Sequence, residues 1–284
     1  MGPGATAPGC LPAAWEGKGS ELALRSRVFL HGFTVVSNRE VARDVVRMEL
    51  RSPELAATIR PGQFINIEVP GDARHLLRIP LSFASASAET GTVELIYAIV
   101  GEGTRRLSHM GQGQTSTALG PGGNGWACPE AGRTLLVAGG AGAPPVIAAA
   151  GMLAERGLRF DVILGARSAD RLWGQREARC YGAGQVSVTT DDGSYGLRGT
   201  TTDAMARLLK GRGYDLVMSC GPAPMMAGVA RLAAERNIPC QVSVERLMAC
   251  GFGVCSCCNV ALATGGNRSC CMDGPVFDAD EVAW

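Results

Sequence analysis

Six cysteines lie within the 22 residues between Cys250 and Cys271, near the end of a chain of 284 residues. The remaining five are scattered singly through the chain, at Cys10, Cys128, Cys180, Cys220 and Cys240. A disulfide scaffold distributes its cysteines through a short secreted chain, whereas a local cluster favours a metal centre. The last forty residues are also too few to form a core alone, so we expect a bound metal centre to stabilise them.

The spacing within this cluster indicates which metal centre it binds. Cys250, Cys255 and Cys258 form the pattern C-x4-C-x2-C, by which plant-type ferredoxins hold a two-iron cluster. The fourth ligand must then come from Cys270 or Cys271, and the spacing leaves that choice open. The sequence therefore predicts a [2Fe-2S] cluster.

Structural zinc is the main alternative at these cysteines. Zinc sites usually combine two C-x2-4-C pairs, but the second half here is the adjacent pair Cys270 and Cys271, which cannot form such a pair. Under the iron–sulfur interpretation Cys257 and Cys270 have no role. Each stands beside a predicted ligand, so the assignment can shift by one position at either place.

Charge and hydropathy exclude two classes of partner. The chain has 27 basic and 26 acidic side chains, so it lacks the basic excess that binds a nucleic-acid backbone. No apolar run approaches the roughly 20 residues of a membrane-spanning helix. Residues 1–25 are rich in Gly, Ala and Pro and lack the pattern of a secretory signal. We expect a flexible tail there and a cytoplasmic protein.

The pattern of apolar runs and turn residues along the sequence predicts three folded parts. Residues 26–127 contain short β-branched runs separated by turn residues, which is typical of a small antiparallel barrel or sandwich. Residues 128–245 alternate apolar runs with helix-like segments, which predicts a mostly parallel sheet with helices on both faces. Residues 246–284 form the cysteine-rich module. The predicted fold class is multi-domain, β plus α/β.

Parallel α/β sheets bind ligands at the carboxyl ends of their strands. Two turns of the α/β part follow predicted strands and are therefore candidate ligand sites. The first, residues 139–145, is a glycine-rich turn that lets a pyrophosphate approach the backbone N–H groups of a helix start. It lacks the third glycine of a G-x-G-x-x-G motif. The second is Cys220-Gly221-Pro222. A tight turn and an ordinary strand-to-helix junction explain these segments equally well when each is taken alone.

The β-rich part carries candidate flavin contacts. Arg78 and Ser82 combine a group that can clamp a pyrophosphate with a hydroxyl that can hydrogen-bond a flavin ring. Tyr97 lies on a predicted strand that leads to Gly103 and Thr104. Barrel core and a plain turn are the alternatives for these three residues.

Together, these motifs resemble the ferredoxin–NADP reductase superfamily and, more narrowly, the electron-transfer subunits of NAD-dependent dihydroorotate dehydrogenase. The resemblance covers the chain from about residue 26 onward, and its most specific part is M-A-C-G-F-G-V-C-x-x-C followed by C-M-D-G-P-V-F-D-A-D-E-V. In that family the last cluster cysteine stands two residues before Asp-Gly-Pro. The resemblance therefore implies Cys271 as the fourth ligand.

The resemblance also implies two nucleotide sites. The FAD contacts that it implies in the barrel are Arg78, Pro80, Leu81, Ser82, Ile96, Tyr97, Ala98, Gly103 and Thr104. The NAD contacts that it implies in the α/β domain are Gly139, Gly140, Gly142, Pro145, Cys220, Gly221 and Pro222. Arg167, Ser168 and Arg171 follow the second strand, where they can bind the 2′-phosphate of NADP or form a solvated loop. The family itself favours NAD.

By this resemblance the chain transfers electrons in pyrimidine biosynthesis and does not itself oxidise the organic substrate. Electrons from FMN in a separate catalytic subunit would pass to the [2Fe-2S] cluster, then to FAD, and as hydride to NAD⁺. The expected assembly is a heterotetramer with two copies of each chain. We assign no general acid or base, and expect Cys220 to shape the hydride path. The alternatives are a flavin/iron–sulfur subunit of a hydrogenase or ferredoxin-dependent transhydrogenase, and a zinc-bearing non-enzymatic adaptor.

Overall fold

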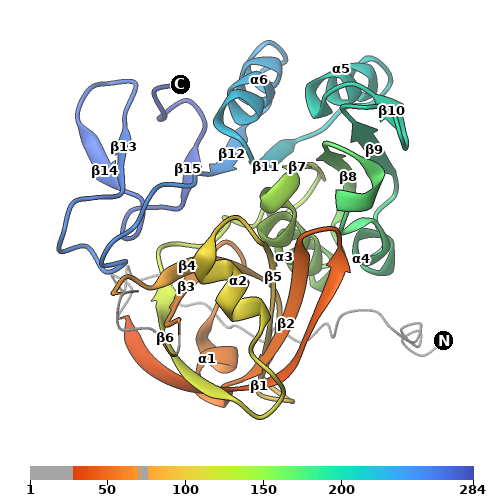
Figure 1. Cartoon of the computed structure of the whole chain (residues 1–284). Helices are drawn as coiled ribbons and strands as arrows, with labels where there is room; N and C mark the ends of the chain where they lie inside the picture. The colour runs from red at the N-terminus through yellow and green to blue at the C-terminus, as the bar shows by residue number, and fades with distance from the viewer. Residues whose placement is uncertain (1–27, 70, 72–75) are drawn as a thin grey trace.

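A closed antiparallel barrel forms the first folded part of the chain. The computed structural model describes residues 28–69, 71 and 76–284, so the predicted tail at residues 1–25 lies outside the described residues. The strands follow one another around the barrel in the order β1-β2-β5-β4-β3-β6 (Figure 1). Their bounds are β1 (Phe29–Ala42), β2 (Val45–Arg51), β3 (Phe64–Ile67), β4 (Ile79–Ser87), β5 (Thr92–Ala98) and β6 (Thr115–Gly122), with short helices α1 (Pro53–Thr58) and α2 (Glu102–Ser108). Of the barrel and sandwich alternatives, the barrel is confirmed.

Alternation along the strands decides which side chains fill the barrel. In β3, Ile65 and Ile67 are fully buried in the barrel core, so Phe64 and Asn66 face outward. Both outward residues are nevertheless buried. Other parts of the chain must therefore cover this strand from outside, as the site described below shows.

The second part is a seven-stranded sheet in the order β10-β9-β8-β7-β11-β12-β15, in which the first six strands run parallel. The strands are β7 (Arg133–Gly139), β8 (Arg159–Ala166), β9 (Val186–Thr190), β10 (Leu197–Arg198), β11 (Leu216–Cys220) and β12 (Cys240–Ser243). The helices are α3 (Ala143–Glu155), α4 (Gln175–Cys180), α5 (Thr201–Gly211) and α6 (Ala223–Ala234), with short 3-10 turns η1 (Gly140–Gly142) and η2 (Ala169–Arg171). This architecture confirms the predicted parallel α/β part.

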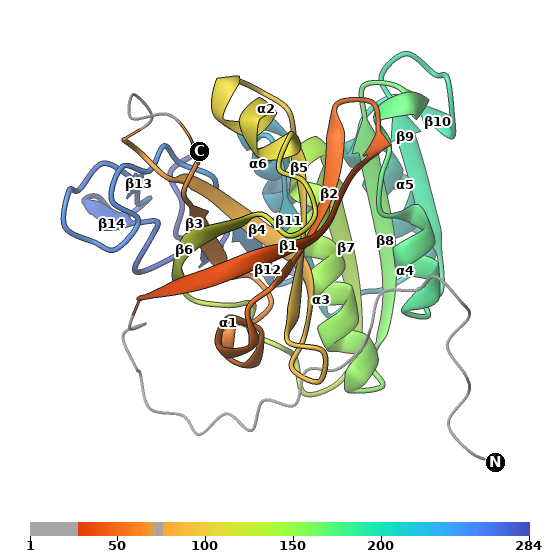
Figure 2. The ribbon, with the colours of Figure 1, turned by 60° about the horizontal axis from the view of Figure 1, so that its bottom comes forward.

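The barrel and the sheet pack against each other through α3. Ala148 of this helix belongs to the buried core of the barrel, although most of α3 lies in the core of the sheet. Figure 2 shows α3 between the barrel strands and the sheet. None of the helices in the described part of the chain is long and apolar enough to cross a membrane.

The cysteine-rich end of the chain contains three short strands, whereas its sequence shows little periodicity. β13 (Asn259–Ala261) and β14 (Asn267–Ser269) form a hairpin, and β15 (Val276–Asp278) pairs antiparallel with β12 as the last strand of the sheet. Each strand has three residues, which is too short for an alternation to be recognised. The end of the chain is thus joined to the α/β sheet by backbone hydrogen bonds.

Asn124, just after β6, joins the barrel to this C-terminal segment. Its Nδ2 donates to the carbonyl oxygens of Asp273 (3.0 Å) and Val276 (2.8 Å). Its Oδ1 accepts from the N–H of Val276 at 3.0 Å. Three hydrogen bonds of one side chain thus hold the turn that follows Cys271 against the barrel.

Candidate functional site

Cys250 lies in a loop whose N–H groups stabilise its thiolate. Burial opposes ionisation of this thiol, but hydrogen bonds from the N–H groups of Phe252, Cys255 and Val254 and from the Cys255 thiol lower its pKa to about 6. The N–H of Phe252 is 3.5 Å from the Cys250 sulfur. Thiolates are the form that binds metal, so this loop favours a metal ligand at Cys250.

Cys258 and Cys271 form a second contacting pair. The N–H of Cys271 donates to the sulfur of Cys258 at 3.4 Å, and both side chains are buried. Burial, together with the neighbouring Cys258, raises the pKa of the Cys271 thiol to about 12. The four predicted ligands therefore come as two pairs, Cys250 with Cys255 and Cys258 with Cys271.

This pairing fits a two-iron cluster better than a single ion. In a cluster held by four cysteines, each iron takes two thiolates, whereas a zinc ion needs all its ligands around one point. The donor set consequently fits the iron–sulfur group.

The two surplus cysteines have different surroundings. The buried Cys270 thiol donates to the carbonyl oxygen of Val244 at 3.1 Å, and burial raises its pKa to about 12. Its side chain is thus engaged with the strand end at β12. Cys257 is exposed beside the buried Cys258.

The loop of residues 250–258, here named the cluster loop, rests on the outer face of barrel strand β3. Phe64 packs in one buried group with Cys258, Cys270, Cys271 and Phe277 of β15. Gly251 has a positive φ of 76°, and a Cβ there would collide with the side-chain amide of Asn66. Only glycine allows this close approach, so Gly251 brings the loop into contact with the barrel.

The two turns predicted to bind NAD lie in direct contact. A Cβ on Gly142 would overlap the backbone of Cys220 and come within 2.6 Å of the N of Gly221. Ala138 is paired with Cys220 in the parallel register of β7 and β11, which brings the two strand ends together. The structure therefore joins these distant segments at the carboxyl edge of the sheet.

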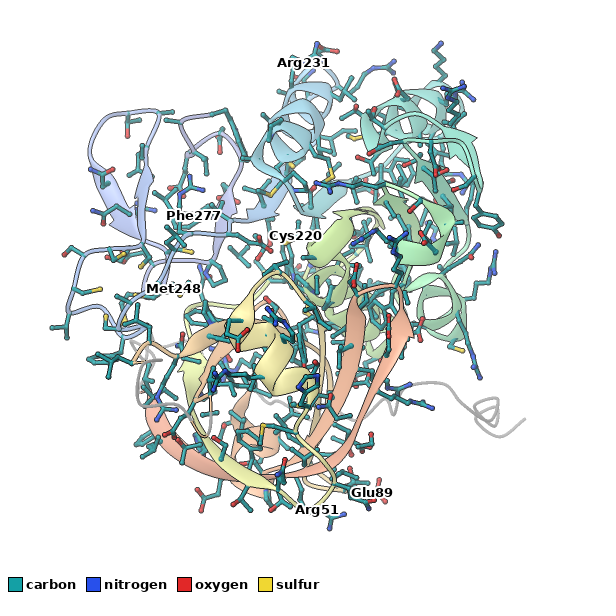
Figure 3. All side chains as sticks on the ribbon, viewed as in Figure 1. Arg51, Glu89, Cys220, Arg231, Met248 and Phe277 are labelled. Carbon is teal, nitrogen blue, oxygen red and sulfur yellow. The ribbon has the colours of Figure 1, made fainter. Side chains whose placement is uncertain are left out.

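Cys220 stands at the end of β11 and is fully buried. Burial, reinforced by the negative charge of Glu245, raises the pKa of its thiol above the ordinary value. A neutral thiol is a poor nucleophile, which agrees with the expected shaping role. Figure 3 shows Cys220 near the place where the barrel, the sheet and the C-terminal segment meet.

The predicted FAD residues occupy neighbouring strands of the barrel. In the antiparallel register of β3 and β4, Phe64 faces Ser82, Ile65 faces Leu81, and Asn66 faces Pro80. The residues from the next strand are Ile96, Tyr97 and Ala98 of β5. The stretch 78–82 thus lies beside the strand against which the cluster loop packs.

Several of these side chains already have partners in the barrel. Arg78 donates to Thr117 through both Nη atoms at 2.9 Å, and Glu68 lies 3.4 Å from Nη2. Thr104 accepts hydrogen bonds from the N–H groups of Val100 and Gly101 at the start of α2. Tyr97 is buried, and its hydroxyl has no hydrogen-bond partner among the described residues. Arg78 is therefore oriented by the barrel wall.

Two of the three residues predicted for a 2′-phosphate site already have side-chain partners. Ser168 donates to Asp170, and Arg171 forms an ion pair with Asp44 of the barrel. Arg167 is the remaining candidate. Of the histidines, His31 is buried and bonded to the carbonyl of Gly120 at 3.1 Å, which is a structural role.

Sequence reasoning missed Asn66 and Asn124, which join the barrel to the cysteine-rich segment. Within QFINIEV, Asn66 is a polar residue at an outward position of a strand whose outward neighbour is Phe64. This combination is a signal that the outer face is covered. No comparable pattern marks Asn124.

The barrel, the parallel α/β sheet and the paired cysteines define a ferredoxin reductase-like protein with a C-terminal iron–sulfur module. Residues 245–283 match the family described as the iron–sulfur cluster binding domain of dihydroorotate dehydrogenase B. A solved structure of an NADH-dependent reduced ferredoxin–NADP oxidoreductase, described for flavin-based electron bifurcation, is 33% identical with a TM-score of 0.82, covering 89% of this chain and 90% of that one.

Two curated relatives show which family within this class of proteins the chain belongs to. The electron transfer subunit of dihydroorotate dehydrogenase B (NAD(+)) from Bacillus velezensis is 37% identical and covers 88% of this chain and 97% of the relative. The subunit of the same name from Streptococcus pneumoniae is 38% identical and covers 89% of this chain and 98% of the relative. The chain belongs to the family of dihydroorotate dehydrogenase B electron transfer subunits.

Proposed function

We propose that this chain transfers electrons between the FMN of a dihydroorotate dehydrogenase catalytic subunit and NAD⁺. The observation that carries the proposal is the meeting of three predicted sites. The cysteine loop lies against β3, β3 pairs with the stretch 78–82, and Cys220 ends β11 near the same place (Figure 3). A [2Fe-2S] cluster supplies one-electron transfer and FAD accepts one or two electrons, so together they link one-electron to hydride chemistry.

The proposed cluster ligands are Cys250, Cys255, Cys258 and Cys271. The choice of Cys271 over Cys270 is supported by their surroundings, because Cys271 contacts Cys258 while Cys270 donates to Val244. The backbone N–H groups around Cys250 favour the thiolate that a metal requires. These residues hold the cluster against the barrel wall and the end of the sheet.

The proposed FAD site is formed by Arg78, Pro80, Leu81, Ser82, Ile96, Tyr97, Ala98, Gly103 and Thr104. Arg78 is held by Thr117 while keeping a guanidinium at the site, so a bound pyrophosphate meets an oriented charge. The proposed NAD site is formed by Gly139, Gly140, Gly142, Pro145, Cys220, Gly221 and Pro222. The contact of Gly142 with Cys220 supports one continuous site. We propose that these residues orient the two rings and exclude water.

We further propose that the catalytic subunit docks beside the cluster loop, in an assembly with two copies of each chain. Three large apolar side chains of this loop region are exposed, namely Leu247, Phe252 and Val254. Exposed apolar side chains grouped at one place are typical of protein interfaces. We also propose a cytoplasmic location, because the local clustering of cysteines favours metal ligands over a disulfide scaffold.

A visible absorption spectrum and co-purification test the proposal. We expect flavin and iron–sulfur bands in the purified chain, bleaching by NADH, and recovery of a dihydroorotate dehydrogenase catalytic chain with a tagged bait. A colourless, zinc-containing protein would contradict the proposal and favour an adaptor.

A second candidate is a subunit of a ferredoxin-dependent transhydrogenase. It is favoured by the similarity to the NADH-dependent reduced ferredoxin–NADP oxidoreductase, which covers 89% of the chain. Recovery of a transhydrogenase or hydrogenase partner in place of a dihydroorotate dehydrogenase catalytic chain would support it.

A further inference from the structure

Asn66 is a polar side chain on the outside of the barrel that is only 2% exposed. Its neighbours in β3, Ile65 and Ile67, fill the barrel interior, so the amide of Asn66 faces away from the barrel core. What lies against it is Gly251, the residue after Cys250 in the cluster loop. The cluster loop therefore contributes to the burial of Asn66.

The amide of Asn66 is incompletely satisfied. Its Nδ2 is buried and has no hydrogen-bond partner in the described part of the chain. Leaving a buried donor unpaired costs about 1–3 kcal/mol. By contrast, Asn124 joins the barrel to the same C-terminal segment with its amide fully bonded. An unpaired amide in an otherwise well-bonded junction indicates that its acceptor belongs to a bound group.

The position of Asn66 restricts what that acceptor is. On one side, Asn66 faces Pro80 in the register of β3 and β4, within the proposed flavin stretch. On the other side, it contacts the loop that carries Cys250 and Cys255. Sulfur atoms of a cluster held by this loop are hydrogen-bond acceptors.

We propose that Asn66 is a positioning residue whose Nδ2 donates a hydrogen bond to the sulfur atoms bound by the cluster loop. This inference rests on the proposed iron–sulfur function. Hydrogen bonds to cluster sulfurs stabilise the more negative, reduced state and so raise the reduction potential. A residue of the barrel thereby sets the potential of a cluster whose ligands all come from the C-terminal segment.

The test compares Asn66→Leu with Asn38→Leu in the full-length protein loaded with iron, sulfide and FAD. Asn38 is the matched control, because it is a partly buried barrel asparagine that donates to the carbonyl oxygens of Leu107 and Met110 at the end of α2. Potentiometric titration followed by electron paramagnetic resonance measures the cluster potential, and iron analysis measures its content. We expect a more negative cluster potential in Asn66→Leu, full iron content, and no shift in Asn38→Leu.

Asn66→Ser, which is smaller but keeps a donor, serves as the second variant. We expect its cluster potential to lie nearer the wild-type value than that of Asn66→Leu. An unchanged potential in Asn66→Leu with full iron overturns the proposal. Loss of iron from both Asn66 variants, with iron retained in Asn38→Leu, also overturns it in favour of a packing role. A wild-type protein without a two-iron signal contradicts the proposed function itself, which keeps the two failures distinguishable.

Discussion

Arg171 donates to Asp44 across the boundary between the sheet and the barrel, with 2.6 Å between Nη2 and Oδ2. A second pair of reversed polarity lies beside it, since Arg43 of the barrel is 3.2 Å from Asp170. The turn between β1 and β2 is thus joined to η2, the segment that follows β8. Both pairs are partly exposed, so each contributes about 0.2–1 kcal/mol to the stability of the interface.

The Arg171–Asp44 pair leads to a prediction about nucleotide preference. Because Arg171 is already neutralised, we expect the protein to oxidise NADH faster than NADPH. In Asp44→Ala the freed guanidinium can attract a 2′-phosphate, so the rate ratio should move toward NADPH by roughly threefold, the factor for about 0.7 kcal/mol. Steady-state rates with both nucleotides measure this. Arg43→Ala removes the other pair and should leave the ratio unchanged, and an equal shift in both variants would refute the explanation.

Glu94 leads to a prediction about pH and stability. It is buried in β5 and paired with Arg47, and burial raises its pKa to about 7 despite that partner. Between about pH 4.5 and 7 the folded state keeps a proton that the unfolded state has released. Wild-type stability should therefore fall as pH rises through this window, by up to about 1.4 kcal/mol per pH unit.

Replacement of Glu94 isolates this contribution. Urea unfolding of Glu94→Gln at several pH values should show a flatter dependence between about pH 4.5 and 7 than the wild type. Glu89→Gln, an exposed change on the same barrel, is the control and should follow the wild-type curve. Parallel curves for wild type and Glu94→Gln would show that Glu94 does not carry the pH dependence.

Asp161 leads to a prediction about the core of the sheet. Its side chain is fully buried in β8, where burial opposes its charge but hydrogen bonds lower its pKa. The donors are Arg212 at 2.7 Å, Tyr214 at 2.8 Å and Arg133 at 3.2 Å. This stabilisation is present above the unfolded pKa of 3.8 and is lost as pH falls toward the lower folded value.

Asp161→Asn should lower the free energy of unfolding at pH 7 by about 3 kcal/mol, because it leaves two guanidinium groups without their partner. Chemical unfolding measures the change. Asp215→Asn is the control: this exposed carboxylate accepts from the backbone N–H of Arg133 at 2.7 Å, and its loss should cost about 1 kcal/mol or less. Equal losses in the two variants would contradict a buried network at Asp161.

Gly251 leads to a prediction about cluster content. Gly251→Ala introduces a methyl group that collides with Asn66, in addition to strain from the positive φ of 76°. Gly266 has a similar φ of 82° but open space around it, so Gly266→Ala carries only the strain, about 1 kcal/mol. We expect iron content per chain to fall in Gly251→Ala alone.

The double variant Asn66→Ala/Gly251→Ala tests the collision directly. Since Asn66→Ala removes the atoms in the way, it should recover part of the lost iron, as a positive coupling between the two sites. If both glycine variants retain iron equally, the contact between the loop and the barrel does not govern cluster binding.

The sequence predicted the fold where local pattern and topology agree. Short alternating runs in residues 26–127 predicted the barrel, and apolar runs such as 135–139 and 161–165 fall within β7 and β8. These signals are local, because alternation and helix period are properties of neighbouring residues. The family resemblance is confirmed by relatives at 37–38% identity, while the domain boundaries at 127 and 245 and the individual ligand residues stay predictions.

What could not be predicted depends on contacts between distant segments. The spacing of cysteines cannot show that Cys270 turns to Val244 while Cys271 turns to Cys258. Likewise, nothing near Arg171 in the sequence indicates Asp44, which lies 127 residues away. The three-residue strand β15 is defined only by its partner β12. Such features exist only once the chain has folded.

The pairing of β15 with β12 has a practical consequence for obtaining a cluster-free form of this protein. Truncation after residue 245 would remove β15, the strand that pairs with β12. The backbone of β12 would then form an unpaired sheet edge, which promotes pairing between molecules and aggregation. A cluster-free reductase is better made by replacing cysteines than by shortening the chain.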